Sequence, residues 1–402
     1  MSLISEFMRN YTNLRVKSLF LGIIALICCS LYVNAEQVTE QPAERLPLEE
    51  LRTFSEVYYH VKSHYVEEVD DQVLIKAAIR GMVSSLDKHS KFLDSSDLVN
   101  FTADNNGEYA GIGLSFVDHQ LGIKIDTIVK NSPADHKNLK KGMIVTKIND
   151  INIAKISSDD AYKLLRGKEA SKVKLTIVEP SQPAEYKDYI LTREIVYLPS
   201  VSSDRLPVNT GYLAIYQFTK KSPIEFIEAI NEMSAVKPLE KLIIDLRDNP
   251  GGTLESAIEI SDLFIDSGIL LTSSGRTADA SELFEASNIT PYKDLKVVVI
   301  MNAYSASSSE ILAAALQDHK KAVILGDVSY GKGSIQSIYF LRQESGLKIT
   351  TAKYFSPNGH AIQDVGIKPD VNFKTNDLVN HQDSKVLDDL EILQAFELLS
   401  KR

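Results

Sequence analysis

The sequence predicts an α+β protein of several domains: an N-terminal helical segment, a β-rich domain and a layered α/β core. The first observation is the length of 402 residues, which corresponds to two or three domains at roughly 150 residues each. The second is a change near residue 101 from helical apolar spacing to short β-type runs broken by Gly and Asn. The third is a pair of continuous apolar runs, 242–246 and 296–301, typical of strands buried on both faces.

The composition places the chain among globular proteins and excludes several classes of function. Hydrophobic residues make up 44% and charged residues 24%, which excludes a wholly disordered, collagenous or polytopic membrane protein. The formal net charge is -10 and there is no long block of Lys and Arg. Because nucleic-acid binders draw affinity from basic patches, we expect no nucleic-acid partner.

Residues 1–35 have the layout of a secretory signal peptide. Arg9, Arg15 and Lys17 precede the uncharged stretch 18–35, which ends in small residues spaced as a cleavage site expects. We therefore expect an exported protein of the periplasm or cell envelope, anchored in the membrane if the segment is not cleaved. Both cysteines, Cys28 and Cys29, lie in this segment, so cleavage would leave a chain without cysteine.

The next two segments are expected to be a linker and a helical region. Residues 36–47 are polar and contain two prolines, as linkers do. In residues 48–100, apolar side chains recur at helical spacing from Leu51 to Tyr65, and a second helix is expected over 71–86. His60 and His64 lie one turn apart, but HVKSH lacks the Glu of HExxH, so we interpret them as surface histidines.

Residues 101–192 carry the pattern of a β-rich domain with one helical insert near Asp160 to Leu165. AGIGLSF and the later SPADHKNLKKGMIVTKINDINI resemble a PDZ domain over about 85 residues. A Gly-Ile-Gly-Leu loop turns successive N–H groups toward one point, where they can hold the carboxylate of a peptide C-terminus. The expected peptide-binding residues are Gly111, Ile112, Gly113 and Leu114; the alternative is that the glycines serve only a hairpin. Met143 departs from the usual Asp.

Residues 193–375 should form the α/β core, followed by a helical tail over 376–402. Three unusual segments follow apolar strands: DLRDNPGG at 245–252, NAYSASSSE at 302–310 and GDVSYGKGSIQ at 326–336. The third nearly spells a phosphate-binding loop, but Gly333 replaces its Ser/Thr and the residues that follow alternate like a strand. In the tail, Val386, Leu390, Leu393 and Phe396 would form the apolar side of a helix.

The sequence has neither a GxSxG elbow nor an HExxH motif, and its eight histidines are scattered. A Ser-His-Asp triad is not excluded, but the residues favour Ser with Lys. An amine can act as a base when burial lowers its pKa. Lys332 stands between two glycines after an apolar strand, where its stem could be enclosed.

These motifs together resemble the carboxyl-terminal processing proteases, or tail-specific proteases. The resemblance rests on GMVSSLDKHSKFL, the PDZ-like domain, DLRDNPGG, SASSSEILAAALQDH, GKGSIQ and YFSPNGHAIQDVGIKPD, which run in order from about residue 50 to 375. It implies a layered, crotonase-like core in which Ser307 is the nucleophile, Lys332 the general base and Gln336 a residue that orients the lysine. It also implies an oxyanion hole from Ser308 and the Gly251-Gly252 turn.

Two features of the nucleophile segment leave alternatives open. Ser307 and Glu310 also fit the S-x-x-E capping box, which by itself predicts only the start of a helix. Ser308 stands where the family commonly has Ala, and Tyr330 where it commonly has Phe. The competing hypothesis is a catalytically silent PDZ scaffold that binds C-termini.

No cofactor and no metal are expected for a Ser-Lys mechanism. The expected partners are protein substrates with accessible C-termini. The family also often works with an adaptor, here an adaptor lipoprotein, or as a homo-oligomer.

Overall fold

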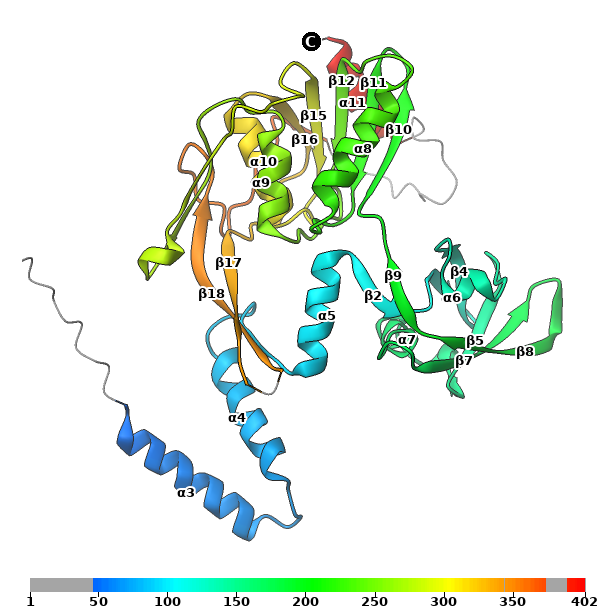
Figure 1. Cartoon of the computed structure of the whole chain (residues 1–402), viewed down its shortest axis with the longest axis vertical. Helices are drawn as coiled ribbons and strands as arrows, with labels where there is room; N and C mark the ends of the chain where they lie inside the picture. Colours follow the sequence, from blue (N-terminus) through cyan, green and yellow to red (C-terminus); the bar gives the residue numbers. More distant parts are fainter. Residues whose placement is uncertain (1–45, 343, 374–388, 402) are drawn as a thin grey trace, which may run out of the picture. The chain divides into compact units, whose positions relative to one another are not determined.

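The computed structural model describes residues 46–342, 344–373 and 389–401 (Figure 1). The predicted signal peptide, both cysteines and most of the linker lie outside these residues. The chain divides into two compact units after Lys76. No helix within the described ranges is long and apolar enough to cross a membrane.

The N-terminal helices form as predicted. They are α3 (Leu48–His64) and α4 (Asp71–Ser84), and in the first unit Lys62 pairs with Asp71 at 2.7 Å. No residue of α3 is buried, so its apolar stripe faces outward. The periodicity therefore predicted the helix correctly, although the stripe has no packing partner within its own unit.

A turn and a short helix follow α4 and lead into the PDZ domain. The turn precedes β1 (Lys91–Leu93), which pairs with β18 (Gly346–Phe355), and the Ser90 hydroxyl accepts the N–H of Thr350 at 3.2 Å. The helix α5 (Ser95–Asn106) is capped by Asp94, whose carboxylate accepts the N–H of Asp97. It ends at Gly107, where a φ of 72° allows the chain to turn.

The PDZ domain is built on an antiparallel sheet with the strand order β3-β4-β5-β7-β8, with β6 paired to β5. Its strands are β3 (Leu114–His119), β4 (Gly122–Ile128), β5 (Ile144–Ile148), β6 (Ile151–Asn152), β7 (Lys172–Glu179) and β8 (Gln182–Thr192). The short helices are α6 (Pro133–His136), η1 (Ile153–Lys155) and α7 (Ser158–Leu165). A separate ribbon of β2 (Glu108–Gly111) and β9 (Glu194–Tyr197) joins the entry and exit of the domain.

The core contains a six-stranded sheet with the order β10-β11-β12-β15-β16-β19. All neighbours from β11 onward are parallel, as the continuous apolar runs predicted. The strands are β10 (Val201–Leu206), β11 (Thr210–Ile215), β12 (Lys241–Asp245), β15 (Lys296–Met301), β16 (Ala322–Gly326) and β19 (Val371–Asn372).

Helices cover both faces of this sheet (Figure 1). On one face lie α8 (Ser222–Ser234), α9 (Leu254–Asp262) and α10 (Ser308–Asp318), and on the other α11 (Leu390–Ser400). Alternate residues of one strand serve the two layers, since Ile244 packs toward the first face and Ile243 toward the second. The predicted apolar side of the last helix was wrong at Leu390 and Leu393, which are exposed, and right at Phe396, which packs against the core. Val386 lies outside the described residues, and the helix buries Ile392, Ala395 and Leu399.

A second, antiparallel sheet completes the core. Its order is β1-β18-β13-β14, and β17 also pairs with β18. The remaining elements are β13 (Ile269–Gly275), η2 (Ala278–Ala280), β14 (Leu283–Glu285) and β17 (Ser334–Phe340). The residues after Lys332 are thus a strand, as their alternation predicted, whereas a phosphate-binding loop would lead into a helix.

Candidate active site

The three unusual segments meet because each follows a parallel strand of the same sheet. DLRDNPGG follows β12, NAYSASSSE follows β15 and the GKG segment follows β16. Main-chain bonds hold these strand ends in register: Leu246 donates to Ile300 at 2.9 Å and Asp327 donates to Met301 at 3.1 Å. The carboxyl edge of the sheet therefore gathers the predicted chemistry at one place.

Ser307 stands at the first turn of α10 in a constrained conformation. Its φ is 57°, a region that residues with a Cβ rarely adopt. The residue is held on both sides, because Ala306 donates to the Asn249 carbonyl at 2.9 Å and the Ser307 N–H donates to the Glu310 carboxylate at 2.7 Å. Strain of this kind persists only where neighbours enforce it, and it is common at reactive groups.

Glu310 is the residue that ties the segments together. It is fully buried, and its carboxylate accepts four hydrogen bonds. Oε2 accepts the N–H groups of Ser307 and Lys332, and Oε1 accepts the N–H of Gly331 and the hydroxyl of Ser329. A buried carboxylate needs such donors, and here they come from the nucleophile segment and the GKG segment.

Lys332 is partly buried, and its ammonium group is shifted toward the neutral form. Burial lowers the pKa of Lys332, the charge of Lys348 lowers it further, and the charge of Glu310 acts in the opposite direction. The main chain of the GKG segment is held by Tyr354, because the Tyr354 hydroxyl donates to the Lys332 carbonyl. An amine poised in this way has the properties of a general base.

Tyr354 also contacts the Ser307 side chain. It is 2% exposed, and burial raises the pKa of its phenol, followed by the charge of Glu310. A hydrogen bond with the Ser307 side chain opposes that rise. The hydroxyl of Ser307 is thereby engaged by Tyr354, and no Ser307–Lys332 side-chain hydrogen bond is present among the described residues.

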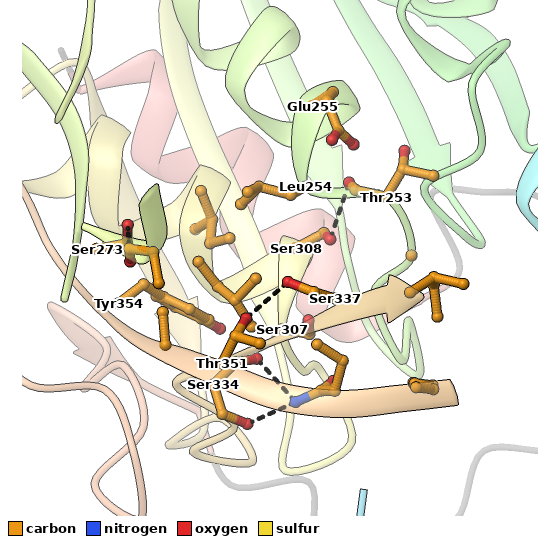
Figure 2. Close-up of a pocket in the computed structure, with 18 of the residues that line it drawn as sticks. Thr253, Leu254, Glu255, Ser273, Ser307, Ser308, Ser334, Ser337, Thr351 and Tyr354 are labelled. Atoms are coloured by element: carbon orange, nitrogen blue, oxygen red, sulfur yellow. Dashed lines mark hydrogen bonds between the residues drawn. The ribbon is translucent and has the colours of Figure 1, made fainter. Parts of the chain in front are cut away.

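Ser307 and Lys332 line one cavity of about 500 Å³, shown in Figure 2. Gly252, Ser308 and Gln336 line it as well. The Gln336 amide donates to the Ser334 hydroxyl at 3.0 Å and to the Thr350 hydroxyl at 3.3 Å, so in this structure it faces its own sheet. Five of the predicted site residues are therefore brought together, although Gln336 does not contact the lysine amine here.

The Gly251-Gly252 turn lies directly against the nucleophile segment. A Cβ on Gly252 would stand 1.8 Å from the Phe218 carbonyl oxygen, and one on Gly251 would stand 2.7 Å from the Ser307 Cβ. Only glycine fits either position. The Gly251 N–H already donates to Asn249 Oδ1 at 2.8 Å, so of the two glycines it is Gly252 that keeps an N–H for a ligand.

Lys332 also lines a second cavity, of about 600 Å³. His89 lines it, and His89 Nε2 is buried without a hydrogen-bond partner in the part of the chain that the structure describes. Burial, then the charges of Lys332 and Lys88, lower the pKa of His89. His319, the histidine nearest to the serine cluster in sequence, instead bonds the Ile269 carbonyl at 2.7 Å.

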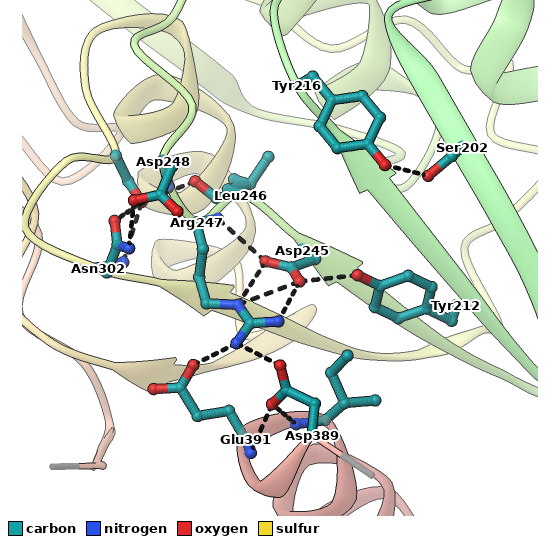
Figure 3. A network of polar contacts seen from close by, with 12 residues as sticks. Ser202, Tyr212, Tyr216, Asp245, Leu246, Arg247, Asp248, Asn302, Asp389 and Glu391 are labelled. Atoms are coloured by element: carbon teal, nitrogen blue, oxygen red, sulfur yellow. Dashed lines mark hydrogen bonds and ion pairs between the residues drawn. The ribbon is translucent and has the colours of Figure 1, made fainter. Parts of the chain in front are cut away.

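The DLRD segment is anchored to the C-terminal helix by a buried ion-pair network (Figure 3). Arg247 donates to Asp245 at 2.6 Å, to Asp389 at 2.9 Å and to Glu391 at 2.6 Å. Tyr212 adds a hydrogen bond to Asp245 at 2.8 Å. The strand end that leads into the glycine turn is thus held by residues at the start of α11.

The predicted peptide-binding loop turns at a glycine and is covered by an aromatic ring. Gly113 has a φ of 77°, and a Cβ there would stand 2.1 Å from the Cβ of Ser132. A Cβ on Gly111 would stand 2.4 Å from the ring of Tyr109, and the Gly113 N–H bonds the Tyr109 phenol. The side chains of Ile112 and Leu114 are buried in the domain core.

Two residues that line the cavity, Tyr354 and Lys348, and the buried Glu310 beside them were not predicted as functional from the sequence. Glu310 was noted only as a possible helix cap, and its spacing from Ser307 could not reveal its bonds to 329–332. Tyr354 and Lys348 lie in β18 and reach the cavity only through the antiparallel pairing of β17 and β18. The spacing of Tyr354 and Lys348 in the sequence gives no sign that they lie near Ser307 and Lys332.

Comparison with known proteins identifies the family to which the chain belongs. The family models that match are "Peptidase family S41" at residues 209–373, the PDZ domain at 98–178 and "Activating protease CtpB N-terminal domain" at 29–96. A carboxy-terminal-processing protease of Bartonella bacilliformis is 33% identical over 360 residues, which cover 88% of this chain and 82% of that protein. A probable CtpA-like serine protease of Staphylococcus aureus strain COL is 33% identical, over 87% of this chain and 71% of that one.

A solved structure shows the same fold. The putative S41 protease from Bacteroides fragilis NCTC 9343 matches with a TM-score of 0.51 at 16% identity, covering 84% of this chain and 92% of that one. The chain is therefore a protease in which a PDZ domain is joined to an S41 core. It belongs to the carboxy-terminal-processing proteases of peptidase family S41.

Proposed function

We propose that this protease is a serine endopeptidase in which Ser307 is the nucleophile and Lys332 its general base. The supporting observation is that both side chains line one cavity while their main-chain N–H groups share Oε2 of Glu310. Lys332 Nζ takes the proton of Ser307 Oγ, and Oγ bonds to the peptide carbonyl carbon. The lysine then returns the proton to the leaving amine, and water releases the acyl group.

The oxyanion of the tetrahedral intermediate would be held by the N–H groups of Gly252 and Ser308. The Gly251 N–H is excluded from this role by its bond to Asn249. Each donor of this kind is worth roughly 10² to 10³ in rate. In the described structure the serine hydroxyl is engaged by Tyr354, so a turn of the Ser307 side chain toward Lys332 would precede attack. Gln336 would then reorient the amine.

Replacement of Ser307 or Lys332 by Ala tests the mechanism. We expect each variant to lose cleavage of a protein with an apolar C-terminal tail. Ser307 should be labelled rapidly in the wild type and slowly in Lys332→Ala, which lacks the base, and residue 307 should not be labelled in Ser307→Ala. A fluorophosphonate probe followed by mass mapping identifies the labelled residue. Undiminished cleavage by Ser307→Ala, or labelling elsewhere, would overturn the assignment. Absence of both cleavage and labelling in the wild type would favour the silent scaffold.

We propose that the PDZ domain binds the C-terminal tails of substrates. Support comes from the glycine loop at Gly111–Leu114 and from β3, whose edge could take up a peptide strand against α7. A bound carboxylate would take over the Gly113 N–H that now bonds the Tyr109 phenol. A peptide with a free carboxylate should bind at least tenfold more tightly than its C-terminal amide, as measured by calorimetry. Equal affinities would exclude recognition of the carboxylate.

An adaptor lipoprotein and a homo-oligomer stay predictions, which a pull-down with Ser307→Ala would test.

We also propose that the protein is exported by residues 1–35. The support is the sequence alone: three basic residues, an uncharged stretch and a small-residue site before Glu36. N-terminal sequencing of the protein recovered from the cell envelope should begin at Glu36. Recovery of the full-length chain in the membrane fraction would show the anchored form, and recovery in the cytosol would overturn export.

A further inference from the structure

A second lysine lines the cavity that contains Ser307 and Lys332. Lys348, in β18, contributes to the cavity wall, and its ammonium group lies 5.3 Å from the centroid of the Phe101 ring on α5. Within the described residues, no carboxylate forms an ion pair with Lys348 and none with Lys332. The cavity thus holds two lysines, and the carboxylates that also line it, Glu255, Asp279 and Glu282, form no ion pair with either among the described residues.

The groups that face Lys332 come from three elements and carry both signs. Glu310 lies on α10, Lys88 and His89 lie in the turn before β1, and Lys348 lies on β18. Glu310 forms the frame that joins the nucleophile and base segments, but its negative charge favours the protonated lysine. The carboxylate of Glu310 therefore stabilises the protonated form of Lys332, whereas the proposed general base must be neutral.

Lys348 is placed to offset the charge of Glu310. After burial, its charge is the largest influence that lowers the pKa of Lys332, ahead of the opposing charge of Glu310. Lys88 acts in the same direction but is exposed and donates to the Tyr330 hydroxyl at 3.2 Å, so solvent screens it more.

Lys348 and Lys332 differ in their surroundings. Burial, then the charge of Lys91, lowers the pKa of Lys348; Lys91 is its register partner on β1. The Phe101 ring favours the charged form of Lys348, because a cation is attracted to the face of an aromatic ring. Lys332 has no such ring contact among the described residues, so the ring favours the charged form of Lys348 alone.

We propose that Lys348 is a positioning residue of the active site, whose charge, held against Phe101, balances Glu310 and keeps Lys332 as the neutral amine that accepts the Ser307 proton. The role is electrostatic and is exerted through Lys332. This inference rests on the proposed Ser-Lys mechanism and adds to it the group that tunes the base. A neighbouring cation is an established way to activate a lysine.

The experiment compares full-length Lys348→Met, Lys348→Arg and the control Lys353→Met, an exposed lysine of the same strand. The readouts are the pH profile of kcat/KM and the rate at which a fluorophosphonate labels Ser307. Because activity requires neutral Lys332, the rate rises with pH through the Lys332 pKa. Loss of the Lys348 charge raises that pKa, so the rising limb of Lys348→Met should move to higher pH by about 0.5 to 1 unit with an unchanged plateau.

Lys348→Arg and Lys353→Met should keep the wild-type limb. A Lys348→Met limb that does not move overturns the inference, and so does a higher KM with an unmoved limb, which would make Lys348 a substrate contact. Thermal unfolding of each variant identifies a folding defect. Such a defect lowers the plateau of the pH profile but leaves its rising limb at the same pH. Ser307→Ala and Lys332→Ala run in parallel: if they keep full activity, the Ser-Lys mechanism itself has failed; if they are inactive, the Lys348 result stands by itself.

Discussion

The main-chain N–H groups of Ser307 and Lys332 donate to the same atom, Oε2 of Glu310, at 2.7 and 2.9 Å. The two residues are 25 positions apart and belong to segments that follow different strands. One buried carboxylate thus sets the spacing of the main chain at the nucleophile and at the base. A hydrophobic residue at this position would leave four donors without an acceptor.

Glu310→Gln should remove most activity without unfolding the protein. The amide is isosteric, but its NH₂ group cannot accept hydrogen bonds, so either Ser307 and Lys332 or Gly331 and Ser329 lose their acceptor. A displacement of about 1 Å at such a site costs roughly 10² in rate. The measurement is kcat with the rate of Ser307 labelling. Glu259→Gln, at an exposed position of α9, is the matched control, and equal activity of both variants would contradict the role of Glu310.

Gly252→Ala should abolish activity and destabilise the core. The added Cβ would meet the Phe218 carbonyl at 1.8 Å, and the φ of 152° is costly for alanine, so the turn must shift and carry its N–H away from the cavity. Cleavage and thermal unfolding are the measurements. Gly81→Ala is the control, because nothing lies within 4 Å of its Cβ; this helical position should become more stable by about 0.5 to 1 kcal/mol. Wild-type activity of Gly252→Ala would exclude the proposed oxyanion hole.

Arg247→Met should destabilise the core by about 3 kcal/mol. The substitution leaves Asp245, Asp389 and Glu391 buried without the guanidinium that they share, and breaking a buried pair in this way costs several kcal/mol. Denaturant unfolding measures the change. Arg205→Met, an arginine that bonds only main-chain carbonyls of α8 and its loop among the described residues, is a useful comparison. If Arg247→Met lowers the free energy of unfolding no more than Arg205→Met does, the ion-pair network adds little to stability.

Lys332→Met should make the inactive protein more stable at neutral pH. The pKa of Lys332 is lower in the folded than in the unfolded protein, so the unfolded state binds the additional proton between that lowered pKa and 10.5. Stability of the wild type therefore rises with pH across this window, and below it the burial of a charged lysine carries its full cost. We expect Tm to increase by about 2 °C at pH 7 and less at pH 10. An equal gain at both pH values would indicate packing alone.

Much of the architecture could be predicted because local pattern and fold agree. The continuous apolar runs at 242–246 and 296–301 became central parallel strands, and the alternation after Lys332 became β17. The last helix shows the limit of such patterns. Leu390 and Leu393 were predicted on its apolar side but are exposed, whereas Asp389 and Glu391 are buried because they pair with Arg247.

The sequence by itself determined the class of enzyme, a carboxy-terminal-processing protease, because its motifs occur together and in order along the chain. It also predicted the residues of the proposed mechanism from the SASSSE and GKG segments. Only the tertiary structure decided how those residues are held and tuned. The four bonds of Glu310, the hydroxyl of Tyr354 and the charge of Lys348 act between segments that are remote in sequence. Hydrogen bonds and electrostatic interactions depend on distance in space, and the pairing of β17 with β18 and the order of the parallel sheet set those distances.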